Sequence, residues 1–149
     1  MPCTRRTPVL ALTVAAATLG LAAGPASAAK NPYSPGQVCG AGYGVIDQRV
    51  VRTAGGTALG TGYLLYSGAT KKNCAVVLKS KAVGKPSYTA VSLKKSGARS
   101  PFVVDFGDYQ YYAGPVYVKA PRQCVKFGAS IKLPDKRHGV FVTPFGHCS

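Results

Sequence analysis

The fold is best predicted from the stretch FVVDFGDYQYYAGPVYVKA at residues 102–120. It begins with a run of β-branched and aromatic residues at 102–106, is interrupted by Gly107 and Asp108, and resumes with an alternating run at 116–119. β-Branched and aromatic residues favour strands, whereas Gly and Asp favour turns. The stretch therefore predicts a strand, a turn and a second strand.

Four of the nine tyrosines lie in this stretch: Tyr109, Tyr111, Tyr112 and Tyr117. Tyrosine commonly sits half-buried, with its ring packed and its hydroxyl in reach of water. Two interpretations follow. The four rings are either part of the core of a sheet or an aromatic patch that contacts a partner.

On both sides of this stretch, short β-type runs alternate with turn residues at the spacing of about 8 to 12 residues that is typical of all-β domains. No window shows a sustained helical period with caps. Residues 29–38 contain Pro32, Pro35 and Gly36, which predict an extended, poorly anchored lead-in. We expect an antiparallel all-β domain at 39–149, a sandwich or a barrel of about seven strands. The further expected strands are 45–52, 59–66, 74–80 and 88–94.

Residues 1–28 predict a signal peptide. Arg5 and Arg6 supply a positive start, residues 9–23 are apolar, and the Ala-Ser-Ala at 26–28 is typical of a cleavage site. Arg5 and Arg6 also suggest the twin-arginine route, but residues 7–9 continue that motif poorly, so general secretion is preferred. No second long apolar run follows, and no transmembrane helix is expected in the secreted chain.

Cleavage after residue 28 leaves 121 residues, with 17 Lys and Arg against four Asp and a net charge of +13. Cys3 leaves with the signal peptide and is expected to be neither a lipid anchor nor a disulfide partner. Four cysteines remain: Cys39, Cys74, Cys124 and Cys148. In a small secreted domain they predict two disulfides, for which three pairings are possible.

The last hairpin indicates which pairing to expect. Residues 125–132 alternate strictly between apolar and polar or small side chains, and residues 134–139 are rich in turn formers. A hairpin centred on Lys136 places Cys124 opposite Cys148, and also pairs Phe127 with Phe145 and Ile131 with Phe141. We therefore expect Cys124–Cys148 and Cys39–Cys74. Pro144 predicts that the final strand is an edge or is bulged.

The sequence offers few catalytic groups, because it has no Glu and only two His. Asp105 and Asp108 are expected to pair with a lysine and to form a turn, respectively, rather than to act as paired carboxylates. His138 and His147 are expected at opposite ends of the last hairpin, which is too far apart for a nuclease site. Metal-ligand spacings are absent, and no metal or cofactor is expected.

Charge is the most informative feature for function. The segment 71–99 carries basic residues and no acid. Such a segment is either a solvated surface that favours solubility or a surface that binds polyanions by counterion release. Outside the cell the expected partners are anionic wall or spore-surface polymers, and no motif predicts specific nucleic-acid binding. The residues concerned are Lys71, Lys72, Lys79, Lys81, Lys85, Lys94, Lys95 and Arg99.

Four blocks of the chain together resemble one known family. They are CGAGYGVI at 39–46, KNCAVV at 72–77, YQYYAGPVYV at 109–118 and CVKFGA at 124–129. The combination is similar to the spore-associated protein A family of streptomycetes. The resemblance implies a small exported protein found with spores or aerial growth, without catalytic residues to transfer.

These observations favour a secreted, non-enzymatic protein held at a spore or cell surface by basic residues. An antimicrobial or enzyme-inhibitory binding protein is the alternative, because a cationic disulfide-locked scaffold suits that role too. A secreted nuclease or other hydrolase is the least favoured reading.

Overall fold

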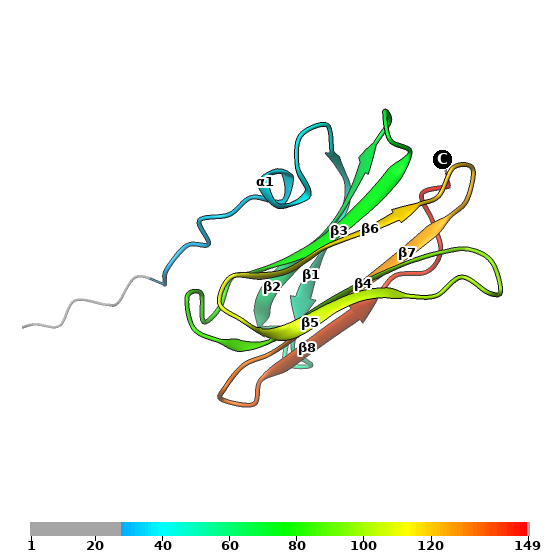
Figure 1. Cartoon of the computed structure of the whole chain (residues 1–149). Helices are drawn as coiled ribbons and strands as arrows, with labels where there is room; N and C mark the ends of the chain where they lie inside the picture. Colours follow the sequence, from blue (N-terminus) through cyan, green and yellow to red (C-terminus); the bar gives the residue numbers. More distant parts are fainter. Residues whose placement is uncertain (1–27, 149) are drawn as a thin grey trace, which may run out of the picture.

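A computed structural model describes residues 28–148. In this part of the chain eight strands form two antiparallel four-stranded sheets that pack face to face (Figure 1). The prediction of an all-β fold is confirmed, and the fold is a sandwich rather than a barrel. The signal peptide predicted for residues 1–28, with Cys3, lies outside the described residues except for Ala28.

Sheet A has the strand order β1-β2-β3-β6, and sheet B has the order β5-β4-β7-β8. The strands in chain order are β1 (Gly44–Arg52), β2 (Ala58–Ser67), β3 (Lys72–Lys79), β4 (Ser87–Lys95), β5 (Val103–Tyr109), β6 (Tyr112–Lys119), β7 (Val125–Lys132) and β8 (His138–Val142). β5 does not end at Gly107 and Asp108, as the sequence suggested. It continues to Tyr109, and the chain turns at residues 110–111 into β6, which joins the other sheet.

The inner faces of the two sheets form the main core. In β7 the alternation predicted from the sequence buries Val125, Phe127, Ala129 and Ile131, and these side chains pack against residues of sheet A. Removing such side chains from water supplies most of the free energy that holds a sandwich together.

β3 is buried on both faces, which accounts for its continuous apolar run. Its inner residues, Ala75 and Val77, belong to the main core. Its outer residues, Cys74, Val76 and Leu78, form a second cluster with Cys39. Something must therefore cover the outer face of sheet A.

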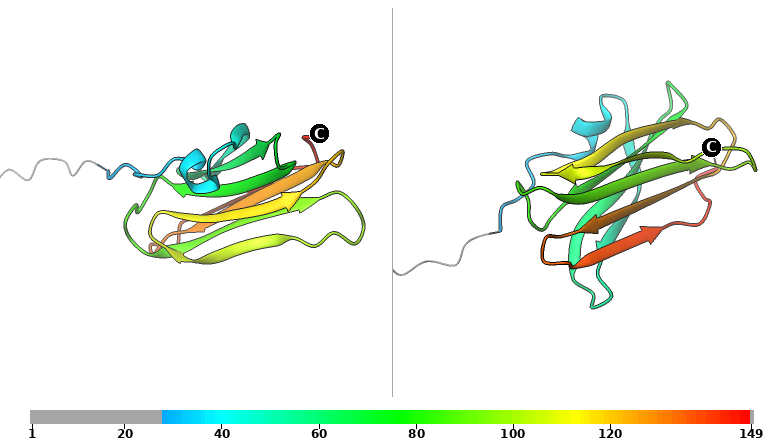
Figure 2. Two further views of the ribbon diagram at one scale, coloured as in Figure 1. Left: turned by 45° about the horizontal axis from the view of Figure 1, so that its top comes forward. Right: turned by 60° about the horizontal axis from the view of Figure 1, so that its bottom comes forward.

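The N-terminal segment provides this cover, which corrects the prediction of an extended, poorly anchored lead-in. A short helix, α1 (Pro35–Cys39), lies against β2 and β3 on the side away from sheet B (Figure 2). Its N-cap is Ser34, whose side chain accepts from Gln37 N while the Gln37 side chain accepts from Ser34 N. Asn31 Nδ2 fixes the segment further by donating to the carbonyls of Lys79 and Tyr111.

The disulfides join Cys39 to Cys74 and Cys124 to Cys148, the pairing expected from the last hairpin. The register behind that expectation was wrong, because Ala129 rather than Ile131 lies opposite Phe141. The shift is absorbed beyond β8, around Pro144, where the chain pairs again through Val125 and Gly146. β8 is an edge strand of sheet B, as Pro144 predicted.

No helix within residues 28–148 is long and apolar enough to cross a membrane.

Candidate functional site

Three connections, β2 to β3, β4 to β5, and β6 to β7, lie at the same end of the sandwich (Figure 1). These connections and the strand ends beside them carry basic residues. Antiparallel pairing places these connections together, since β3 starts beside the end of β6 and β4 ends beside the start of β7. A hydrogen bond of 2.7 Å from Ser96 N to the Cys124 carbonyl links two of the loops. We call this the cationic end, and its residues are Lys71, Lys72, Lys94, Lys95, Arg99, Lys119, Arg122 and Lys126.

Two pairs of lysines face each other directly across neighbouring strands at the cationic end. Lys72 lies opposite Lys119 in sheet A, and Lys94 lies opposite Lys126 in sheet B. Like charges placed directly opposite each other destabilise a sheet. Bound anionic groups would relieve this repulsion, so the arrangement favours anion binding.

None of the eight cations forms an ion pair with a carboxylate within residues 28–148. The ammonium groups of Lys94 and Lys126 instead lie 5.1 and 5.2 Å from the centre of the Phe102 ring, and Lys126 lies 4.8 Å from that of Phe145. These cation–π contacts hold the two ammonium groups in place without neutralising them.

Of the eight basic residues expected from the run 71–99 to form one surface, five belong to the cationic end. Lys81 and Lys85 are exposed but lie beyond the far end of β3, at the opposite end of the sandwich. Three members of the cationic end, Lys119, Arg122 and Lys126, were missed because only the strand order brings them to this place.

Lys79 corrects the prediction most clearly, because its side chain is buried rather than surface-exposed. Its Nζ donates to the carbonyls of Lys85 at 2.6 Å and Tyr109 at 3.0 Å. Burial lowers the pKa of this ammonium group from its ordinary value. The two hydrogen bonds join the end of β3 to the segment before β4 and to the end of β5. Because its ammonium group is buried and bonded in this way, Lys79 does not contribute to an anion-binding surface.

The four tyrosines of the opening stretch do not share one face. Tyr112 and Tyr117 lie on the outer side of β6 under the N-terminal segment, where Tyr33 packs on Tyr112 and the Tyr117 hydroxyl donates to the Cys39 carbonyl at 2.8 Å. Tyr111 packs on Tyr33 from the turn. The rings therefore serve mainly as packing elements.

A wide hollow of about 880 Å³ nevertheless remains where β5 and β6 meet, at the end of the sandwich away from the cationic end. Its lining includes Tyr33, Tyr109, Tyr111, Asp105 and Asp108. Asp105 accepts from the Tyr109 hydroxyl and from Gly114 N, both at 2.6 Å, and not from a lysine as the sequence suggested. Asp108 is exposed within β5 instead of forming a turn.

Tyr109 carries a testable pH dependence. The hydrogen bond to Asp105, then burial, then the Asp105 charge raise the pKa of Tyr109 above its ordinary value of 10.0. Its contribution to stability is therefore fully present below about pH 10 and is lost as the pH rises through the folded-state pKa. We expect the stability difference between the wild type and Tyr109→Phe to be constant below pH 10 and to shrink above it.

Urea unfolding between pH 7 and pH 11 measures this difference. Tyr88→Phe is the matched control, because Tyr88 is exposed and its hydroxyl has no hydrogen bond within residues 28–148. A difference for Tyr109→Phe that stays constant to pH 11 would contradict the assignment.

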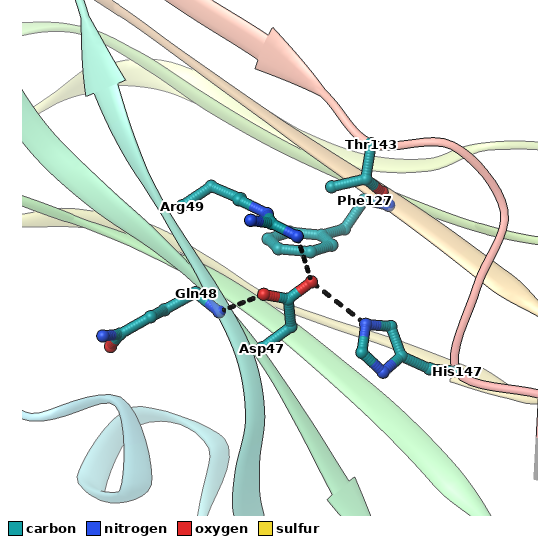
Figure 3. A network of polar contacts seen from close by, with 6 residues as sticks. All are labelled: Asp47, Gln48, Arg49, Phe127, Thr143 and His147. Carbon is teal, nitrogen blue, oxygen red and sulfur yellow. Dashed lines mark hydrogen bonds and ion pairs between the residues drawn. The ribbon is translucent and has the colours of Figure 1, made fainter.

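The candidate catalytic groups do not come together. Asp105 and Asp108 are three residues apart in one strand and so point to opposite sides of it. His138 bonds to Ser130 Oγ at the start of β8, whereas His147 Nε2 lies 3.0 Å from Asp47 Oδ2 (Figure 3). Within residues 28–148 no group of three or more potential metal ligands is found.

The Asp47 site is a structural junction. Its carboxylate also contacts Arg49 at 3.4 Å and accepts from Gln48 N at 2.7 Å (Figure 3). Among the described residues, His147 hydrogen-bonds to Asp47 alone, so no hydroxyl or thiol nucleophile is engaged by this pair. The contact joins the C-terminal tail to β1.

Comparison with known proteins points to one relative. No protein-family model matches the chain, and no solved structure matches it. Spore-associated protein A from Streptomyces coelicolor is 40% identical over 122 residues, which cover 80% of this chain and 70% of the relative. With the two disulfides, this relative indicates an extracellular or surface location. Its identity and coverage agree with the resemblance of the four sequence blocks, and the chain belongs to the spore-associated protein A family.

Proposed function

We propose that this protein is exported and non-enzymatic, and that its cationic end holds it to anionic polymers of the spore or cell surface. The observation that carries the proposal is the presence of two cross-strand lysine pairs, Lys72 opposite Lys119 and Lys94 opposite Lys126, at one end of the molecule. Polyanion binding there gains from counterion release and from relief of the repulsion between the lysines.

The comparison supports the same setting, because the relative is named for its association with spores. The net charge of +13 without the signal peptide draws the protein toward any anionic surface. The scarcity of assembled catalytic groups among residues 28–148 supports a binding role.

Co-sedimentation with isolated cell walls and spores, across a salt series, tests the proposal. We expect binding that weakens steeply with salt and disappears when anionic polymers are removed. Binding indifferent to both treatments would contradict the proposal and would point to the tyrosine-lined hollow instead.

A charge-reversal pair locates the site. We expect Lys72→Glu with Lys119→Glu to weaken binding at least about tenfold near physiological salt and to reduce the salt slope by about two units. The matched control is Lys81→Glu with Lys132→Glu, which changes the net charge equally but acts at the opposite end. Equal losses from the two pairs would show that net charge, and not the cationic end, governs binding.

A further inference from the structure

Within residues 28–148 no segment covers the outer face of sheet B, in contrast to that of sheet A, which the N-terminal segment covers. Large apolar side chains are exposed on it: Phe106 at 64%, Val142 at 60%, Val140 at 58% and Val104 at 47%. They lie on the two edge strands, β5 and β8. Large apolar side chains exposed together on one face of a small protein mark a candidate interaction site.

The strand register shapes this face into a groove. One row across the sheet runs from Phe106 through Ala90 and Ser130 to Val140, and the next runs from Val104 through Ser92 and Gly128 to Val142. The edge strands thus supply tall apolar walls, and the two central strands supply a floor of small side chains. A hollow of about 200 Å³ lies between the walls.

The floor is closely packed at Gly128. A Cβ atom at this position would lie 2.9 Å from the Phe141 carbonyl oxygen and 3.0 Å from Val142 Cγ2. A larger residue there would displace the wall formed by Val142. The depth of the groove therefore depends on glycine at this position.

The two ends of the groove differ in charge. At one end Lys94 and Lys126 lie side by side, with their ammonium groups against the rings of Phe102 and Phe145. At the other end Lys132 shares a row with Asp108. An occupant that complements the face is apolar along its length and negatively charged at the end that meets Lys94 and Lys126.

We propose that the groove binds a single linear acyl chain of an anionic amphiphile. The chain lies between β5 and β8, and its headgroup meets Lys94 and Lys126. The sheet face from Tyr88 to Lys94 spans about 20 Å, and an acyl chain that fills one leaflet of a bilayer spans about 15 Å. The face is therefore long enough for the chain and its headgroup, and the hollow over the rows of Ala90 and Ser92 holds the part of the chain that lies between β5 and β8.

Charge argues against a second copy of this chain as the occupant. The face carries three lysines, Lys94, Lys126 and Lys132, against one carboxylate, Asp108. If two copies stacked through this face, in parallel or antiparallel orientation, lysines of the two copies would lie close together and repel each other. An anionic amphiphile meets no such repulsion.

Three probes, used below their micelle concentrations with the oxidised mature protein, test the inference. Dodecyl phosphate is expected to bind and to shift the backbone amide resonances of Ala90, Ser92, Gly128 and Ser130. Butyl phosphate, which lacks the long chain, and dodecyltrimethylammonium, which has the opposite charge, are expected to bind at least about tenfold more weakly. Equal affinity for either of them would overturn the proposal, as would resonance shifts confined to other surfaces.

Variants separate this site from polymer binding, with which it shares Lys94 and Lys126. Ser92→Leu places a large side chain in the floor of the groove. We expect it to weaken the binding of dodecyl phosphate at least about tenfold and to leave co-sedimentation with isolated cell walls unchanged. Val50→Ser is the matched control, because Val50 is an exposed valine of sheet A. We expect Lys72→Glu with Lys119→Glu to weaken co-sedimentation with cell walls and to leave the binding of dodecyl phosphate unchanged.

Unchanged dodecyl phosphate binding by a folded Ser92→Leu variant would overturn the inference without touching the proposed function. A dimer in sedimentation equilibrium that Val140→Asp dissociates would likewise overturn it, by assigning the face to a second copy.

Discussion

Replacing Cys39 and Cys74 together by alanine is expected to lower the free energy of unfolding by about 4 kcal/mol. The disulfide closes a loop with a sequence separation of 35 residues, and the chain-entropy model assigns about 4 kcal/mol to a loop of this length. Both cysteines are buried, and the bond fixes α1 on the outer face of sheet A. Its loss also frees the segment that covers Val76 and Leu78.

Urea unfolding measures the loss, and hydrogen exchange of the β3 amides shows whether the cover has opened. The matched control replaces Cys124 and Cys148, whose separation of 24 residues gives a similar entropic term but whose bond holds an edge strand and the tail. We expect this second pair to lower stability without exposing β3. Identical exchange of the β3 amides in the two variants would argue against the covering role of α1.

The second large effect is expected at Lys79. Lys79→Ala should lower the free energy of unfolding by about 3 kcal/mol, because it removes the packing of the side-chain stem and leaves two carbonyls without their charged donor. Lys79→Met keeps the stem and removes only the ammonium group, so it should lose about half as much. Denaturant unfolding of both variants separates the two contributions.

Lys85→Ala is the control for this pair. The Lys85 side chain is exposed, and only its backbone carbonyl accepts from Lys79, so the change should stay within about 0.5 kcal/mol. A Lys79→Met variant as stable as the wild type would mean that the two hydrogen bonds contribute no net stability.

Local patterns predicted a strand well where one of its faces is buried and turn residues flank it, as in β4 and β7. β7 is the clearest example, with Phe127 and Ile131 buried and Lys132 exposed. The sequence around α1 carries two opposing signals. Ser34, Pro35 and Gln37 form an N-terminal capping box, whereas Pro32 and Gly36 favour an extended chain, and the structure follows the capping box.

Long-range pairing could not be predicted in the same way. Nothing local in β3 and β6 specifies that these strands become neighbours, yet this pairing brings Lys119 to Lys72. The burial of Lys79 has the same origin, since it ends a strand whose both faces are covered by distant segments. The run 71–99 therefore predicted only part of the cationic end, because Lys119, Arg122 and Lys126 come from later in the chain.

The pairing of β3 with β6 also orders events during synthesis. β3 is apolar on both sides and ends at residue 79, but its second neighbour begins only at residue 112. Until β6 is synthesised, the growing chain contains an apolar strand, β3, with one unpaired edge. The N-terminal segment also lacks the Tyr117 hydroxyl, which donates to the Cys39 carbonyl. Sheet B is completed later than sheet A, by β7 and β8. Sheet A can therefore close only after residue 119 and sheet B only after residue 142, and until then the growing chain exposes unpaired strand edges that favour aggregation.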